Sequence, residues 1–98
     1  MKLKDYRKDL LKRLTDTEYA AEYLESTLAS GDASAFLIAL KDVVDAHGGI
    51  GSLAREIRIT RPSLYKILSR GGNPTLETLQ QILHPLGMRV SIALDEAA

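Results

Sequence analysis

The chain has 98 residues, no cysteine and a formal net charge of zero. That length predicts one domain, residues 1–98. The lack of cysteine excludes disulfides, thiolate metal sites and thiol nucleophiles. No apolar run reaches the roughly 18 residues that a membrane-spanning helix needs. The charged N-terminus also lacks the apolar core of a secretory signal, so we expect a cytoplasmic protein without a membrane partner.

Charge is distributed unevenly although it sums to zero. Residues 1–13 carry +4, residues 14–47 carry −6, residues 48–75 carry +4 and residues 76–98 carry −2. A block of like charge is often only a solvated face, and that interpretation stays open for the N-terminal block. The basic block at 48–75 coincides with two short helices that the pattern predicts there, and it favours a polyanionic partner.

Apolar side chains recur every three or four residues in the first half of the chain, which predicts three helices. We expect them over residues 6–14, from Asp16 or Thr17 to Gly31, and over 33–47. Asp32 is a good N-cap for the third helix. Three glycines, Gly48, Gly49 and Gly51, are expected to break it.

Two short helices joined by a tight turn are expected next, over about 51–57 and 61–69. Ala54 is small enough for the second helix to cross the first closely, and Ile59 is apolar and pins the turn. Thr60 caps the second helix, whose first turn tolerates Pro62. The inward side chains are Leu53, Ala54 and Ile57 in the first helix and Leu64, Ile67 and Leu68 in the second. This is the pattern of a helix-turn-helix, and the alternative is an ordinary helix pair with a solvated basic face.

The C-terminal part should begin with a loop over 69–74 and a helix capped by Thr75. Pro85 should tighten or end that helix near His84. From Met88 to Leu94 apolar and other residues alternate, which is typical of a strand. A lone strand needs a partner for its backbone groups. The economical partner is the same strand of a second copy, antiparallel about a two-fold axis; the alternative is an extended tail lying on the helices.

The outward face of the 61–69 helix carries groups suited to double-stranded DNA. Arg61 or Lys66 can donate to guanine in the major groove, and Ser63 can bond a base edge or a phosphate. Tyr65 can pack on a thymine methyl, and Thr60 lies where a helix start suits a phosphate. Polar residues that flank this helix are expected to contact the sugar-phosphate backbone of the DNA. The expected DNA-binding residues are Ser52, Arg55, Thr60, Arg61, Pro62, Ser63, Tyr65, Lys66, Arg70 and Asn73.

Other chemistry is weakly supported. His47 and His84 are the only histidines, and two isolated imidazoles without cysteine do not predict a metal site. No spacing suggests a nucleophile with its base. We therefore expect no enzyme, no metal and no cofactor.

Residues 53–90 resemble the Xre/Cro-like helix-turn-helix. Leu53-Ala54 is similar to the start of its first motif helix, Ile59-Thr60 to its turn, and Asn73-Pro74-Thr75-Leu76 to the opening of its next helix. The resemblance implies an all-α, lambda-repressor-like bundle of five or six helices, to which we add one short C-terminal strand. Ile50 stands where many relatives have glutamine. Arg58 stands where many have glycine and is expected to adopt an unfavourable backbone conformation.

A second resemblance covers nearly the whole chain. Segments 10–14, 20–32, 36–50 and 63–79 are similar to addiction-module antidote proteins, the HigA-like antitoxins of type II toxin–antitoxin systems. It implies a nucleoid-associated repressor of its own operon that neutralises a RelE/ParE-like toxin. A homodimer would bind a palindromic operator, with recognition helices roughly 34 Å apart.

The expected organisation is an N-terminal helical extension (1–32), a helix-turn-helix core (33–87) and a C-terminal strand and tail (88–98). The acidic stretch within the extension is expected to face the toxin. Two other functions stay open: a stand-alone Xre-type transcriptional regulator without a toxin, and a helical adaptor that never touches DNA.

Overall fold

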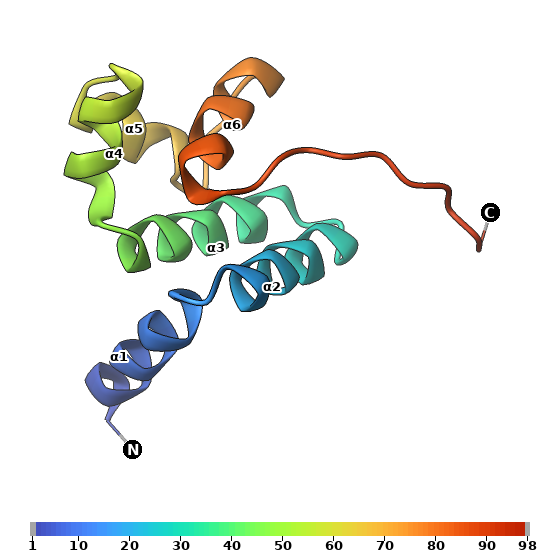
Figure 1. The fold of residues 1–98 in the computed structure, drawn as a ribbon, viewed down its shortest axis with the longest axis horizontal. Coiled ribbons are helices and arrows are strands. Elements are labelled where there is room, and N and C mark those ends of the chain that lie inside the picture. Colours follow the sequence, from blue (N-terminus) through green and yellow to red (C-terminus); the bar gives the residue numbers. More distant parts are fainter. Residues whose placement is uncertain (1, 98) are drawn as a thin grey trace.

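The computed structural model describes residues 2–97, an all-helical chain ending in an extended segment (Figure 1). Its helices are α1 (Leu3–Leu14), α2 (Thr17–Ala29), α3 (Ala33–Ala46), α4 (Gly49–Ile57), α5 (Arg61–Ile67) and α6 (Leu76–Leu83), followed by the 3-10 turn η1 (His84–Leu86). None of these helices is both long enough and apolar enough to cross a membrane. The all-α prediction is confirmed.

Side-chain caps fix where four helices begin. The Asp16 carboxylate accepts from the Glu18 N–H at 3.0 Å, which settles Asp16 rather than Thr17 as the cap of α2. Asp32, Thr60 and Thr75 cap α3, α5 and α6 in the same way. Each cap satisfies an N–H that the helix itself leaves unpaired. All of these starts follow from local sequence.

The expected break at the glycines is shorter than predicted. Only His47 and Gly48, the latter at φ 111°, separate α3 from α4, because α4 already begins at Gly49 rather than near residue 51. Ile50 is 4 % exposed, so burying this side chain offsets the low helix propensity of its two glycine neighbours. α5 ends at Ile67 instead of Ser69. The predicted tightening at Pro85 is confirmed by η1.

α3 lies at the centre of the fold and buries the most side chains, among them Leu40, Val43 and Val44. α1 and α2 pack on one side of it, and α4 to α6 complete the core on the other (Figure 1). No polar side chain is buried among residues 2–97.

α1 is attached through Leu14, which is its only fully buried residue, through Leu10, which packs against the core, and through polar contacts. The His47 Nε2 atom, at the end of α3, lies 2.7 Å from the Leu14 carbonyl oxygen. The Arg7 guanidinium donates to Asp42 at 2.9 Å and to Asp45 at 2.7 Å. His47 is thus a helix-end histidine, as expected.

The predicted C-terminal strand is absent from the described residues. Residues 88–97, which we name the tail, run away from the helices as an extended segment that ends in a turn at residues 96–97 (Figure 1). Met88 packs against the core, but Ile92 and Leu94 are 96 % and 94 % exposed. The physical reason is that a strand requires a neighbouring backbone to bond, and every other described segment of regular structure is helical. Beyond Val90 the tail does not lie on the helices either.

Candidate nucleic-acid interface

The turn between α4 and α5 sets the angle at which α5 leaves the core. Arg58 adopts the left-handed conformation, at φ 60° and ψ 42°. This lets the Ile59 N–H reach the Ala54 carbonyl at 3.0 Å, closing the end of α4, while Ile59 packs on the core. The unfavourable conformation expected for Arg58 is confirmed.

α5 divides cleanly into a buried and an exposed face. Leu64 and Leu68 are 0 % and 1 % exposed. The ten residues predicted to bind DNA are all exposed: Ser52, Arg55, Thr60, Arg61, Pro62, Ser63, Tyr65, Lys66, Arg70 and Asn73. The structure therefore leaves this polar face open to solvent.

The start of α5 carries a small hydroxyl network. Thr60 Oγ1 accepts from the Ser63 N–H at 3.3 Å and donates to Ser63 Oγ at 2.8 Å. In this arrangement the Ser63 hydroxyl proton stays free to donate outward. The Thr60 and Ser63 hydroxyls are therefore held together by their mutual hydrogen bond at the start of α5.

Arg61 reaches back over the first turn of α4. A Cβ atom built on Gly51 would overlap the Arg61 guanidinium. The absence of a side chain at position 51 is what lets this guanidinium lie there, next in sequence to exposed Ser52. The sequence predicts Gly51 only as a helix breaker, because nothing local links it to a residue ten positions later.

Tyr65 turns toward α3 rather than straight outward. The Lys41 ammonium lies 5.6 Å from the centre of its ring, within the range of a cation–π contact, and the ring is 52 % exposed. Lys41 was not predicted as part of this surface, because it lies in the acidic block and only folding brings it beside α5.

Arg70 and Asn73 lie in the loop after α5. The Ser34 hydroxyl donates to the Arg70 carbonyl at 2.6 Å, which fastens the loop to the start of α3. Gly72 is closely packed, since a Cβ there would overlap the Ile67 carbonyl. Both polar side chains are thus presented from an anchored loop.

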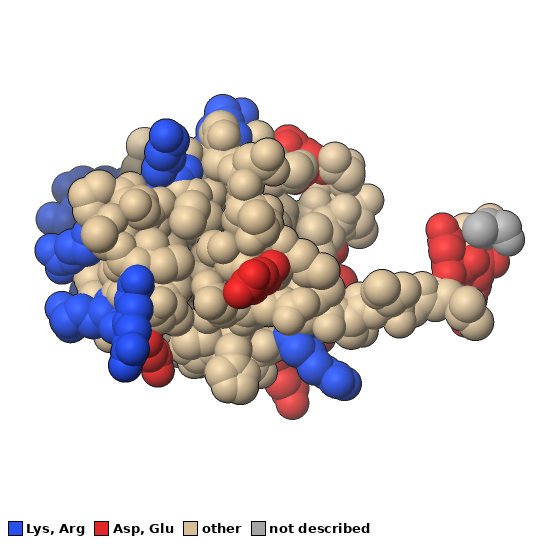
Figure 2. All heavy atoms as spheres, turned by 90° about the horizontal axis from the view of Figure 1, so that it is seen from above, with Lys and Arg blue, Asp and Glu red and all other residues tan. Residues whose placement is uncertain are grey.

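Basic side chains gather at the end of the molecule that holds α4 and α5, and the acidic ones lie mostly elsewhere, including on the tail (Figure 2). The exposed basic residues of this region are Arg55, Arg58, Arg61, Lys66 and Arg70, with Glu56 as their acidic neighbour. A positively charged surface attracts phosphate groups at long range.

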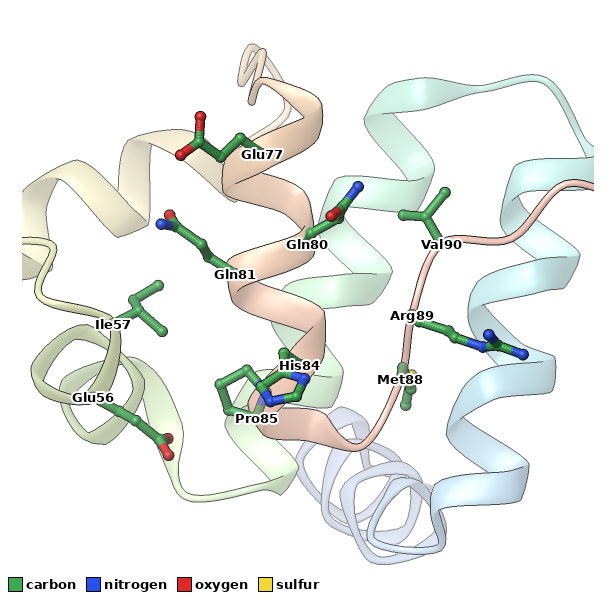
Figure 3. A pocket seen from close by; sticks show the side chains of 10 residues that line it. All are labelled: Glu56, Ile57, Glu77, Gln80, Gln81, His84, Pro85, Met88, Arg89 and Val90. Carbon is green, nitrogen blue, oxygen red and sulfur yellow. The ribbon is translucent and has the colours of Figure 1, made fainter.

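A hollow of about 820 Å³ lies elsewhere, around α6 and the root of the tail (Figure 3). It is lined by Glu56, Glu77, two glutamines and His84, among others, and by none of the ten predicted residues. Among residues 2–97 no cluster of three His, Asp or Glu side chains is placed to hold a metal.

One protein family matches nearly the whole chain. Residues 4–94 match the family described as "Probable addiction module antidote protein". The chain is 33 % identical over 90 residues to an "Uncharacterized protein" of Haemophilus influenzae, covering 92 % of this chain and 90 % of that one. No solved structure matches the chain.

Proposed function

Because the chain belongs to the addiction module antidote family, we propose that it is a DNA-binding antitoxin that represses its own operon and neutralises a partner toxin. We assign it no catalytic step and no cofactor, and we place it in the cytoplasm on the nucleoid. Its DNA target would be a palindromic operator read by a homodimer. The observation that carries the DNA-binding part is the exposed polar face of α5, anchored from beneath by Leu64 and Leu68.

The geometry of α5 suits a major groove. A groove about 12 Å wide admits one helix, and its base edges are read by side chains at the start of that helix. Arg61 and Ser63 supply donors in the first turn of α5 and Lys66 supplies one in its last turn, while the surrounding arginines supply phosphate contacts. Because Arg61 lies over Gly51, we propose that it contacts the DNA near the start of α4 as well.

The toxin contact is proposed for the N-terminal extension. Glu18, Glu22 and Glu25 recur at helical spacing on one exposed face of α2, while Ala20 and Leu24 bury the other face. RelE/ParE-like toxins act on nucleic-acid machinery and are commonly basic, so this acidic face is a complementary surface.

Two variants test DNA binding. Arg61→Ala combined with Lys66→Ala should lower affinity for the operator upstream of the gene by about thirtyfold or more, since each of the two base contacts is worth roughly 1–3 kcal/mol. Arg13→Ala removes an exposed arginine of α1 and serves as the matched control. Unchanged affinity in the double variant, or no operator binding by the native protein, would contradict the DNA-reading proposal and leave a helical adaptor.

A charge reversal tests the toxin contact. Glu18→Lys, Glu22→Lys and Glu25→Lys together should abolish co-purification with the product of the neighbouring gene, while Glu77→Lys on α6 should not. Circular dichroism controls for folding. A neighbouring product that still binds the triple variant would disprove this surface. The stand-alone regulator is favoured instead if no adjacent frame of about a hundred residues encodes a binding protein.

A further inference from the structure

We propose that Gly51 determines part of the sequence specificity of this protein, because it positions the guanidinium of Arg61 over the first turn of α4 and so fixes the base pair that Arg61 reads. The inference rests on the proposed function, since it needs an operator. It adds a residue that has no side chain and that the ten predicted DNA-binding residues do not include. Gly51 acts through Arg61 and is therefore a positioning residue.

The backbone of α4 does not require glycine at position 51. Gly48 and Gly49 adopt φ 111° and φ 89°, a region that residues with a Cβ atom rarely enter. Gly51 is not among the residues with positive φ, and it lies inside α4, where glycine is less favourable than alanine. The reason for a glycine at this place therefore lies in the space around it rather than in its backbone conformation.

The space beside Gly51 is occupied by Arg61. The three heavy atoms nearest to a Cβ atom built there are Nη2, Nε and Cζ of the Arg61 guanidinium, with Nε at 2.7 Å and Cζ at 2.8 Å. Gly51 is buried, whereas Ser52 beside it is exposed. An alanine at position 51 and the present place of the guanidinium therefore exclude each other.

The side chain of Arg61 is the part that can yield to such an alanine cheaply. The atoms in the way are the far end of a flexible side chain. The backbone at the start of α5 is fixed by the Thr60 cap and by the ring of Pro62, which follows Arg61. Within residues 2–97 the Arg61 guanidinium forms no ion pair with a carboxylate, unlike Arg7 and Arg13. Its place over α4 thus depends on the missing Cβ atom, and its N–H donors stay available to DNA.

The place of this guanidinium decides which base it reads. An arginine recognises guanine by donating to O6 and N7 at once, and each bond needs a donor–acceptor distance of about 2.7–3.2 Å. To restore an ordinary contact of about 3.5 Å with a new Cβ atom, the guanidinium must move by on the order of 1 Å. Such a move breaks at least one of the two bonds to the native guanine. Neighbouring bases lie about 3.4 Å apart along a strand, so a larger swing brings the guanidinium to the next base pair.

Binding to singly substituted operators tests this positioning role. The native protein, Gly51→Ala, Arg61→Ala and the double variant are each titrated with the operator upstream of the gene and with duplexes that replace each of its base pairs in turn. Arg61→Ala should lose discrimination at one base pair of each half-site. Gly51→Ala should lose about tenfold in discrimination at that same base pair and keep it elsewhere, because only the guanidinium has moved. In the Arg61→Ala background, Gly51→Ala should have no further effect.

Thermal stability separates positioning from a structural role. Gly51→Ala should leave Tm unchanged or raise it, since alanine is the better helix residue. Gly49→Ala is the matched control on the same helix. Its Cβ atom would meet nothing within 4 Å, but its φ of 89° is strained for alanine, so Tm should fall while the base preference stays native. A fold defect would change Tm and base preference together, whereas a positioning role changes the base preference alone.

Three results would overturn the inference while leaving the proposed function in place. They are an unchanged base preference in Gly51→Ala or in Arg61→Ala, an equal loss of affinity for every duplex in Gly51→Ala, and a loss on Gly51→Ala that persists without Arg61. A native protein that binds no operator would reject the proposed function and this inference with it.

Discussion

The Lys41 ammonium lies 5.6 Å from the centre of the Tyr65 ring, and this contact joins α5 to the central helix of the fold. Lys41 also donates to Asp45 Oδ2 at 3.0 Å, and the same oxygen accepts from Arg7 at 2.7 Å. A continuous polar chain therefore runs from α1 through α3 to the face proposed to read DNA. The ends of this chain are separated by more than fifty residues of sequence.

Arg7 should matter more to stability than its exposure suggests. Arg7→Gln removes one ion-pair partner from each of Asp42 and Asp45, whose side chains are only 14 % and 21 % exposed. We expect the free energy of unfolding in urea to fall by about 1 kcal/mol, the upper end for surface pairs. Arg13→Gln is the control, because its partner Asp9 is 57 % exposed on the same helix. Equal effects of the two changes would show that the α1–α3 clamp is not stabilising.

Tyr23 should make the protein sensitive to alkali. Burial raises the pKa of Tyr23 above its usual value near 10, and the neighbouring Asp42 charge and hydrogen bond raise it further. The folded state therefore holds the phenol proton more tightly than the unfolded state. The contribution of the protonated Tyr23 phenol to the free energy of unfolding is fully present below about pH 10. It is lost as the pH rises through the folded-state pKa.

The variant Tyr23→Phe isolates this effect. It keeps the packing and loses only the 3.3 Å hydrogen bond to Asp42. Urea unfolding should show a small difference from the native protein at pH 7 and a shallower decline above pH 10. A parallel decline in both proteins would contradict the assignment, and Tyr65→Phe is the control for an exposed phenol.

Two adjacent glycines should respond oppositely to alanine. At Gly72 a Cβ would overlap the Ile67 carbonyl, which is backbone and cannot move aside cheaply. Gly72→Ala should cost about 2 kcal/mol and lower Tm by roughly 10 °C. At Gly71 a Cβ meets nothing within 4 Å, so Gly71→Ala should leave Tm unchanged or slightly higher. Differential scanning calorimetry measures the Tm of both variants. An unchanged Tm in Gly72→Ala would mean that the loop after α5 packs differently.

Relief of backbone strain at Arg58 should stabilise the fold. A non-glycine residue in the left-handed conformation costs roughly 1–2 kcal/mol, part of which glycine recovers. Arg58→Gly should therefore raise the free energy of unfolding by about 1 kcal/mol. Arg58→Ala removes the same charge but keeps the strain, and it should not stabilise. A stabilised alanine variant would attribute the gain to charge repulsion within the basic block.

The local elements were accessible from sequence because their causes are local. Asp32, Thr60 and Thr75 cap helices by bonding backbone groups two or three residues away. The apolar spacing of α5 likewise predicted both its buried leucines and its exposed polar face. The strain at Arg58 was instead expected from the resemblance to the Xre/Cro-like helix-turn-helix, in which many relatives have glycine at that place.

Contacts between distant segments depended on the folded arrangement. Gly51 receives the Arg61 guanidinium, and Lys41 meets Tyr65, only because α4, α5 and α3 cross where they do. The start of α4 at Gly49 required the burial of Ile50. The tail has a strand's alternation but no strand, since a ladder needs a second backbone that one copy of this chain does not provide. The spacing of apolar residues predicts which side chains share a face. What that face packs against depends on the tertiary structure around it.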